Sequence, residues 1–422
     1  MKKIIRKIIV WKLGLLARLY LFRMKPEVIA ITGSAGKTTT KEFLRQLLEI
    51  DFNVLATPEG YNTEIGAPLA IFNEKTPKNL ASVFDWLVII VRIFYKALFS
   101  NELPDKLIIE MGADSPGDIK YLAKLFKPKK AVVLTVLPVH LLSFKNIQDI
   151  AKEKSELVKA VDPKGSVFLN YDDELVREMA KLTKSKVNYF STKESHGLVA
   201  RDLDASIAGL SFKLADGSSE YICKVPLYGK HMIYPLLAAI SVAKSEHIAM
   251  DKILNELKTL KPYKGRMNVI EGVKGSIIID DSYNANPKSV TEALDFLSKQ
   301  KGRKIAILGN MNELGEYEIE GHETVGRAAA KSCDILVTVG EVAGKYIGGE
   351  AARSGLNHIK KFTNSKEAGL WVAGEIKEGD TVLVKGSQNN VRLEKAVEEL
   401  MAHPEDKMST LVRQSEFWNE AS

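Results

Sequence analysis

The stretch "ITGSAGKTTTKE", Ile31 to Glu42, decides the fold of this 422-residue chain. It has the Gly-Lys-Thr end of a phosphate-binding loop, but only two residues separate Gly33 from Gly36, where the familiar nucleotide loop has room for about four. The apolar run Glu27–Thr32 before it predicts a buried strand, and a helix is predicted to begin near Lys37. In that arrangement backbone N–H groups face the phosphates, Lys37 neutralises their oxygens, and Thr38 is placed to ligate Mg²⁺.

Short β-branched runs alternate with helical patterns along the next part of the chain. Such runs predict buried strands at Lys106–Glu110, Ala131–Val136 and Ser166–Asn170. With helices between them, these strands imply a largely parallel sheet covered on both faces. The stretch Arg201–Gly229 alternates in polarity and contains an Asp-Gly turn at Asp216, so it predicts a small antiparallel insert or edge. A helix is predicted from about Pro235 to His247.

The pattern restarts around Leu257–Met267, after which further strands are predicted at Ser276–Asp280, Lys304–Leu308, Asp334–Val339 and Thr381–Lys385. We therefore predict an α/β protein in three parts. Residues 1–25 form a short basic, apolar N-terminal helix, residues 26–262 form the domain with the phosphate-binding loop and a mostly parallel sheet, and residues 263–422 form a Rossmann-like α/β domain.

The positive charge of the chain is concentrated at its start. The formal net charge is +7, yet the first 25 residues contain eight Lys or Arg and no acid, so the rest is close to neutral. No recognition motif for nucleic acid is present, and we expect no such partner. Cys223 and Cys333 lie far apart, which favours neither a disulfide framework nor a structural zinc site and is typical of the cytoplasm.

Two apolar segments also contain basic residues. In residues 1–25, Lys12 and Arg18 interrupt the apolar run and no small-residue cleavage site follows, so a signal peptide is not predicted. Neither this segment nor Val83–Phe99 is apolar over the length that spans a bilayer. Two readings of Val83–Phe99 remain open: a core or interdomain helix, or a membrane-surface patch formed jointly with the first segment.

Several further stretches extend the pattern: "GYNTEIGAPLAIF", "IIEMGADSPGDI", "IDDSYNANP", "ELG" followed by His322, and "KGS". Together with the shortened loop, they resemble the Mur ligase family, and within it the MurF type that adds D-alanyl-D-alanine. The resemblance runs from Val28 to about Leu400, and the "YNANP" stretch is its most specific part.

The resemblance implies an ATP- and Mg²⁺-dependent synthesis of an amide bond through an acyl phosphate. A free carboxylate is a poor acylating agent because its oxygen is a poor leaving group. Its oxygen therefore first attacks the γ-phosphate of ATP, an amine then attacks the activated carbonyl carbon, and phosphate leaves. The implied substrates are a muramoyl-tripeptide and D-alanyl-D-alanine, used in the synthesis of peptidoglycan precursors.

The resemblance also implies roles for individual residues. Catalytic roles fall on Lys37, Lys154, Arg266 and Asn284. Nucleotide contacts fall on Gly33, Ser34, Ala35, Gly36, Lys37, Thr38, Thr39, His231, Arg266 and Asp281. Substrate contacts fall on Asn62, Thr63, Glu64, Tyr283, Lys385, Gly386 and Ser387, and metal contacts on Thr38, Glu110, His140 and Lys154.

Among these, the family's modified lysine is best matched by Lys154, with Lys152 as an alternative frame. An ordinary lysine would repel Mg²⁺, whereas a carbamate turns the side chain into an anionic oxygen ligand.

Three departures from the family pattern leave alternatives open. Pro235 stands where an asparagine is expected, Asn310 stands where an aspartate is common, and only 25 residues precede the nucleotide strand, where the MurF type has a UDP-binding domain. The acceptor could therefore be UDP-linked or lipid-linked, the latter with peripheral membrane contact through residues 1–25 and 83–99. A different class of function, a nucleotide-hydrolysing switch at a membrane surface, has no use for His140, Lys154 or the "KGS" stretch.

Overall fold

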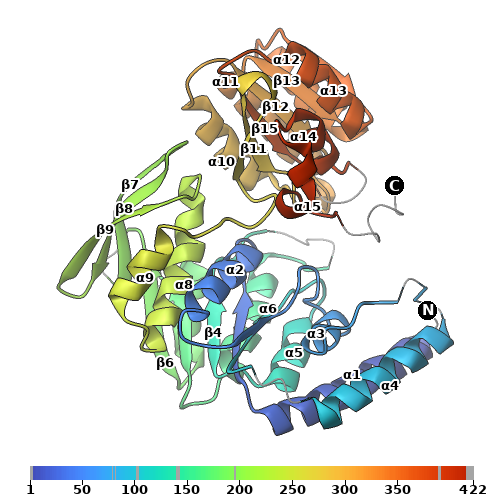
Figure 1. Cartoon of the computed structure of the whole chain (residues 1–422), viewed down its shortest axis with the longest axis vertical. Coiled ribbons are helices and arrows are strands. Elements are labelled where there is room, and N and C mark those ends of the chain that lie inside the picture. The colour runs from blue at the N-terminus through green and yellow to red at the C-terminus, as the bar shows by residue number, and fades with distance from the viewer. Residues whose placement is uncertain are drawn as a thin grey trace.

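The computed structural model describes residues 3–77, 79–80, 82–100, 104–138, 143–193, 196–387 and 391–414, with side chains from residue 5 onward. Two sheets, each covered by helices, lie one above the other in the view of Figure 1. The predicted α/β fold with two mostly parallel sheets is therefore confirmed. Within the described ranges, no helix is long and apolar enough to cross a bilayer.

The first sheet has nine strands among the described residues, in the order β2-β3-β1-β4-β5-β6-β7-β8-β9. Strands β2 through β7 pair in parallel, and β7, β8 and β9 form an antiparallel extension at the edge. Their bounds are β1 Glu27–Thr32, β2 Val54–Ala56, β3 Lys106–Glu110, β4 Lys130–Val133, β5 Ser166–Asn170, β6 Lys186–Ser191, β7 Leu198–Ser206, β8 Gly209–Asp216 and β9 Ser219–Val225.

Alternate residues of β1 enter different hydrophobic clusters, as expected for a strand buried on both faces. Ile29 and Ile31 pack with α2 (Lys37–Leu48), α8 (Ile233–Ser245) and α9 (Met250–Leu257). Val28 and Ala30 pack toward the other face, whose helices are α1 (Lys3–Met24), α3 (Gly66–Ile71), α4 (Val83–Phe99), α5 (Asp118–Phe126), α6 (Ile147–Ala160) and the short α7 (Glu174–Glu178).

The predicted strand Ala131–Val136 was wrong at its end, because β4 stops at Val133. Beyond that point the backbone leaves the sheet and contacts the phosphate-binding loop. The Ser34 N–H donates to the Thr135 carbonyl oxygen at 2.8 Å, and the Leu137 N–H donates to the Ser34 hydroxyl at 2.9 Å. The apolar run thus ends by supporting the loop rather than by extending the strand.

Helices α1 and α4 lie side by side along one flank of the first sheet (Figure 1). The inner side chains of α4, Trp86, Ile89, Ile93 and Ala97, are buried, whereas most of its other face is exposed. The helix Val83–Phe99 thus contributes to the core with one face, as the first open reading predicts, and the second reading, a membrane-surface patch, stays a prediction for the exposed face.

The second sheet has six strands in the described part of the chain, in the order β10-β11-β15-β12-β13-β14. Only its edge strand β10 is antiparallel. The strands are β10 Asn268–Glu271, β11 Ile277–Asp281, β12 Lys304–Gly309, β13 Ile335–Val339, β14 Ile359–Phe362 and β15 Thr381–Lys385. Helices α10 Pro287–Ser298, α11 Glu318–Ser332, α12 Gly348–Arg353, α13 Ser365–Glu375, α14 Glu394–Leu400 and α15 Lys407–Thr410 surround them.

Candidate active site

A cavity of about 1480 Å³ separates the two sheets and is lined from both sides. The loop at Gly33–Thr39, the end of β3 and helix α6 line it from the first sheet. The ends of β11 and β15 and the start of α10 line it from the second. Because the carboxyl ends of parallel strands are the usual ligand-binding edge of such sheets, this cleft is the candidate active site.

The shortened loop has the backbone that its glycines allow. Gly36 caps the N-terminus of α2 with φ +81°, a left-handed conformation that favours glycine. Lys37 begins the helix, and its Nζ donates to the Gly33 carbonyl oxygen at 2.9 Å. The side chain is thus folded back over the loop, where a phosphate would lie.

Thr38 and Glu110 lie together beneath this loop. The Thr38 hydroxyl donates to Glu110 Oε2 at 3.0 Å, and Asn62 Nδ2 donates to Glu110 Oε1 at 3.3 Å. Lys41 Nζ lies 3.7 Å from Glu110 Oε2 and donates to the Thr57 carbonyl oxygen at 2.6 Å. The predicted metal residues Thr38 and Glu110 are therefore in contact, at the end of β3.

The electrostatics keep this carboxylate ionised. Burial by itself raises the pKa of Glu110, but the ammonium groups of Lys41 and Lys37 outweigh it and bring the pKa below its usual value. Burial lowers the pKa of Lys37, an effect that Glu110 opposes and Arg266 strengthens. An anionic Glu110 is thus held among cations at the floor of the cleft.

Lys154 on α6 lines the cleft and is buried, whereas Lys152 is exposed. Burial, followed by the charge of Lys37, lowers the pKa of Lys154 to about 7. Its neighbour Glu153 points elsewhere and accepts hydrogen bonds at 2.8 Å from the N–H groups of Gly117 and Ile119. Of the two frames left open by the sequence, the geometry favours Lys154.

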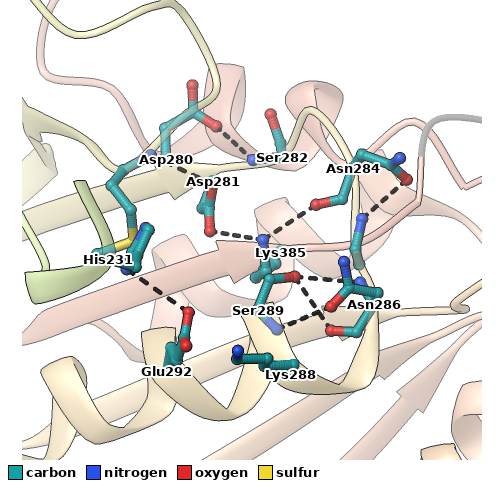
Figure 2. Close-up of polar contacts among 12 residues, drawn as sticks. His231, Asp280, Asp281, Ser282, Asn284, Asn286, Lys288, Ser289, Glu292 and Lys385 are labelled. Atoms are coloured by element: carbon teal, nitrogen blue, oxygen red, sulfur yellow. Dashed lines mark hydrogen bonds and ion pairs between the residues drawn. The ribbon is translucent and has the colours of Figure 1, made fainter. Parts of the chain in front are cut away.

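The second sheet contributes a buried ion pair, shown in Figure 2. Lys385 Nζ lies 2.6 Å from Asp281 Oδ2 and donates to the Asn284 carbonyl oxygen at 3.0 Å. On the facing side, His231 Nδ1 lies 4.0 Å from Glu292 Oε2 of α10, and burial lowers the pKa of this histidine. His231, Asp281, Glu292 and Lys385 thus come from separate segments of the chain and lie near one another in the lining of the cleft (Figure 2).

Arg266 lies where the chain passes from the first sheet to the second. Its guanidinium carbon is 3.9 Å from the ring centroid of Tyr283, a stacked arrangement. The Arg266 Nε is buried and has no hydrogen-bond partner in the described residues. A buried donor without a partner is costly, and this one lines the cleft, so a ligand oxygen would satisfy it.

Three predicted substrate residues do not line the cleft. Glu64 faces the other side of its loop, where its Oε1 lies 2.9 Å from Arg6 Nη2. Gly386 packs against Gly309 and Leu393, and the Ser387 hydroxyl accepts the Asn312 N–H at 3.0 Å, so both support the end of β15. The predicted metal residue His140 lies outside the described residues.

Other predicted residues lie in the cleft as expected. These are Gly33, Ser34, Ala35, Gly36, Lys37, Thr38, Thr39, Asn62, Thr63, Glu110, Lys154, His231, Arg266, Asp281, Tyr283, Asn284 and Lys385. The position of these residues in the cleft agrees with their predicted roles, and those roles stay predictions.

The sequence analysis missed Lys41 and the pair Asp172 and Asp173. Asp172 accepts hydrogen bonds from Ser191, Thr192 and Tyr234, which hold its pKa below the usual value against the effect of burial. The two aspartates come one residue after the predicted strand Ser166–Asn170, and that position at a strand end was the available signal.

His322, part of the family pattern, has a structural position. It is fully buried, its Nε2 accepts the Met311 N–H at 3.0 Å, and its Nδ1 lies 2.7 Å from the Glu318 carbonyl oxygen. Asn310, which stands where the family commonly has Asp, accepts the Ala343 N–H at 2.8 Å through its side chain. Both side chains thus fix loops of the second sheet.

Two family models match the chain. The Mur ligase middle domain matches residues 31–84 and 94–243, and the Mur ligase, glutamate ligase domain matches residues 265–388. The two matched regions contain the loop, the ends of the strands and the polar residues that face each other across the cleft.

Proteins similar to this chain carry consistent names. The UDP-N-acetylmuramoyl-tripeptide–D-alanyl-D-alanine ligase of Mycobacterium tuberculosis is 32% identical over 383 residues, covering 85% of this chain and 70% of its own. The enzyme of the same name from Buchnera aphidicola subsp. Baizongia pistaciae is 30% identical, with 89% and 75% covered. The solved MurF ligase of Thermotoga maritima in complex with ADP superposes with a TM-score of 0.77 at 29% identity, covering 92% of this chain and 83% of that one.

Proposed function

The chain belongs to the Mur ligase family, and from this premise we propose that it joins D-alanyl-D-alanine to the terminal carboxylate of a muramoyl-tripeptide. It is an ATP-dependent ligase of peptidoglycan precursor synthesis. The observation that supports ATP-dependent ligation is the meeting, in one cleft, of the Lys37 loop, the Thr38–Glu110 pair and the buried Arg266 Nε, which has no hydrogen-bond partner in the described residues.

The proposed reaction has two steps. The peptide carboxylate oxygen attacks the γ-phosphorus, forming an acyl phosphate as the bond from phosphorus to the bridging β,γ oxygen breaks and ADP leaves. The amine of D-alanyl-D-alanine then attacks the acyl carbon, loses a proton, and expels inorganic phosphate to leave the amide.

Two basic residues of the cleft can offset the repulsion between the negatively charged substrates in the first step. A carboxylate must approach a triphosphate although both are negative, so cations must be present before they meet. Lys37 lies over the loop, and Arg266, in the connection between the two sheets, presents a buried Nε that has no hydrogen-bond partner in the part of the chain that the structure describes. We assign both to the transferring phosphate.

Magnesium fits the residues beneath the loop. The Thr38 hydroxyl and the ionised Glu110 carboxylate offer adjacent hard oxygen donors, and Mg²⁺ is usually bound through one or two carboxylates plus substrate phosphates. When bound there, the ion would neutralise phosphate charge. Thr38 and Glu110 would hold it, with a carbamate on Lys154 as a further oxygen ligand.

Burial supports the modification of Lys154. Because its pKa is lowered to about 7, much of the amine is neutral near that pH, and only the neutral form reacts with CO₂. CO₂ adds to the nitrogen and the proton is released, which leaves an anionic oxygen in place of the ammonium. Electrospray mass spectrometry in bicarbonate buffer should detect an adduct that Lys154→Ala lacks and Lys152→Ala retains.

We assign the remaining predicted residues by the part of the cleft that they line. Asn62 and Thr63 would contact the peptide substrate, and His231 and Asp281 would contact the nucleotide. Tyr283, Asn284 and Lys385 would hold the reacting groups from the second sheet. Movement of the two sheets toward each other would exclude water, which otherwise hydrolyses an acyl phosphate.

Phosphate release tests the reaction. We expect release from ATP and Mg²⁺ only when a muramoyl-tripeptide and D-alanyl-D-alanine are both present. Lys37→Ala should abolish it, and Lys184→Ala, which removes an exposed lysine elsewhere, should not. Release that proceeds equally without either acceptor would instead indicate a nucleotide-hydrolysing switch.

A membrane-associated form of this activity is supported by the outer faces of α1 and α4. Most of the large apolar side chains that are exposed in the described residues lie there or just before α4: Ile8, Trp11, Leu15, Phe22, Leu80, Val83, Phe84, Leu87, Val91, Phe94, Tyr95 and Phe99. Basic side chains accompany them, as in helices that lie on anionic lipid. We propose that this surface contacts an anionic membrane, which would bring the enzyme to lipid-linked acceptors.

Sedimentation with vesicles tests the membrane contact. Phe84→Ser with Phe94→Ser should reduce co-sedimentation with anionic liposomes, because both side chains are exposed on α4. Ile222→Ser with Leu370→Ser, at exposed apolar positions elsewhere, is the matched control. Equal sedimentation of the two double variants and the parent protein would refute the proposed contact.

A further inference from the structure

A second cavity, of about 570 Å³, lies between α1, α5 and the loop that carries Glu64. It is lined by the basic side chains Arg6, Lys7 and Arg18, by Trp11, and by Glu64 and Tyr121 on the facing elements. We call it the α1 groove. None of its residues belongs to the active-site cleft described above.

The α1 groove has an excess of positive charge. Arg6 forms an ion pair with Glu64 at 2.9 Å. No carboxylate of the described residues lies within ion-pair distance of Lys7 or Arg18, although both line the groove. Two uncompensated cations beside an exposed indole are suited to an anionic ligand that also has a ring or apolar part.

The shape of the groove depends on a glycine within α1. A Cβ at Gly14 would lie 3.0 Å from the Tyr121 hydroxyl oxygen, so a side chain here would crowd the floor. Glycine in the middle of a helix costs about 1 kcal/mol relative to alanine. Gly14 is nevertheless suited to this position, because α5 approaches so closely that a larger residue would crowd Tyr121.

The groove and the active-site cleft lie on opposite sides of one loop. Thr63 lines the cleft, and the next residue, Glu64, lines the groove. An extended peptide of three residues spans about 10 Å. A ligand whose peptide end lies beside Thr63 in the cleft would need to cross only this loop to bring its other end to the groove beside Glu64.

We propose that the α1 groove binds the diphosphate of a diphosphate-linked muramoyl-peptide acceptor. Lys7 and Arg18 pair with phosphate oxygens, and Trp11 covers the group attached beyond them. This assignment rests on the proposed ligase function, since it names the acceptor of that reaction. The same chemistry is present whether the diphosphate is linked to a nucleoside or to a polyprenyl chain.

Calorimetric binding in the presence of saturating ADP tests the proposal without requiring turnover, because ADP occupies the phosphate-binding loop. The double variant Lys7→Ala with Arg18→Ala should bind UDP-muramoyl-tripeptide at least about ten-fold more weakly than the parent protein. Lys12→Ala with Lys25→Ala removes the same charge from the same segment but outside the groove, and should bind as the parent does. A muramoyl-tripeptide without phosphate should bind all three proteins equally.

The same variants show whether the groove binds a UDP-linked or a lipid-linked diphosphate, and whether its cations instead contact the membrane. A ten-fold loss with a polyprenyl-diphosphate-linked peptide in detergent, but no measurable binding of the UDP form by the parent, would assign the groove to the lipid-linked acceptor. Unchanged affinity of the Lys7→Ala, Arg18→Ala protein for both forms would overturn the proposal, and if liposome binding alone fell, these cations would belong to the membrane surface. Binding that depends on the groove, with no amide product, would contradict the ligase reaction and leave the groove assignment standing.

Discussion

Three lysines and one glutamate dominate the charge around the phosphate-binding loop. Lys41 lies 3.7 Å from Glu110, and Lys37 acts electrostatically on both Glu110 and Lys154. Lys37 and Lys41 thus place positive charge beside the loop before any ligand arrives, which matches a triphosphate, whereas Lys154, with a pKa of about 7, contributes less of that charge. Glu110 is the exception, and its place beside Thr38 marks the metal position.

Glu110→Gln should lower the ligation rate by about 100-fold or more at fixed Mg²⁺, because the amide keeps the shape but removes the anionic oxygen. Initial rates over a Mg²⁺ titration measure the effect. Asp114→Asn is the control, since Asp114 lines the same cleft and does not contact Thr38. Equal losses in the two variants would show that general charge, and not a metal contact, is responsible.

Lys154→Met should stabilise the protein in bicarbonate-free buffer by about 1 kcal/mol or more at pH 7. The folded pKa of Lys154 is about 7, below its ordinary 10.5, so the burial cost is fully present below pH 7 and the stability of the parent protein rises as pH increases from about 7 toward 10.5. Thermal unfolding at pH 6 and pH 9 should therefore show a larger difference between variant and parent at pH 6. A difference that grows with pH would contradict this assignment.

At the scale of elements, the loop and the start of α2 depend on one backbone conformation. Gly36 has φ +81°, and a Cβ there would lie 3.2 Å from Pro235 Cγ and 3.3 Å from Leu134 Cδ1. Pro235, the residue that departs from the family pattern, lies in the first turn of α8, where proline is tolerated. It packs directly behind the loop.

Gly36→Ala should weaken ATP binding by about ten-fold or more, because backbone strain and the contact with Pro235 both displace the N–H groups of the loop. Isothermal titration with ATP measures it. Gly217→Ala isolates the effect of backbone strain, since Gly217 has φ +60° with open space around it in a hairpin turn. A Gly36 variant that binds ATP as tightly as the Gly217 variant would refute the steric argument.

The strands could be predicted where the apolar pattern is strong. Glu27–Thr32, Lys106–Glu110, Ser166–Asn170 and Thr381–Lys385 were predicted with the bounds that the structure has. The end of β4 could not be predicted, because Leu134 and Val136 continue the apolar pattern although the chain is already leaving the sheet. The Leu134 N–H donates to Thr32, the last residue of β1, and the Val136 N–H donates to the Asp173 carboxylate. The short edge strand β2 has too few residues to give a periodic signal.

At the scale of the whole molecule, the connection between the sheets contributes to the site. Tyr263 donates from this connection to Glu59 Oε2 at 2.7 Å, and burial raises the pKa of Glu59. Arg266 follows and stacks on Tyr283 of the second sheet. The connection between the two sheets therefore also contributes Arg266 to the lining of the cleft.

Arg266→Lys should lower kcat/KM by about ten-fold or more with little change in Tm, because lysine has neither the planar stack on Tyr283 nor the Nε donor. Steady-state kinetics and thermal unfolding measure the two effects. Arg303→Lys, which alters the ion pair with Asp380 outside the cleft, should show the opposite pattern, with unchanged kcat/KM and reduced Tm. Identical behaviour of the two variants would contradict the proposed role of Arg266.

A residue of the candidate site could be predicted from the sequence where it belongs to a recognisable motif or stands at the end of a predicted strand. Lys37, Thr38, Glu110 and Asp281 were found in this way, whereas the direction of a side chain from a loop was not predictable. Glu64 sits next to Thr63 in sequence but faces Arg6, because only the folded position of α1 determines which side of the loop is occupied. The packing of α1 against α5, which forms the groove, likewise depends on contacts between distant segments.

Mass spectrometry of the product tests the central claim most directly. The protein is incubated with ATP, Mg²⁺, D-alanyl-D-alanine and UDP-muramoyl-tripeptide or its lipid-linked counterpart. We predict a product heavier than the acceptor by one dipeptide less one water, absent with Lys37→Ala. ATP hydrolysis that continues with neither acceptor converted would contradict the assignment as a ligase of D-alanyl-D-alanine.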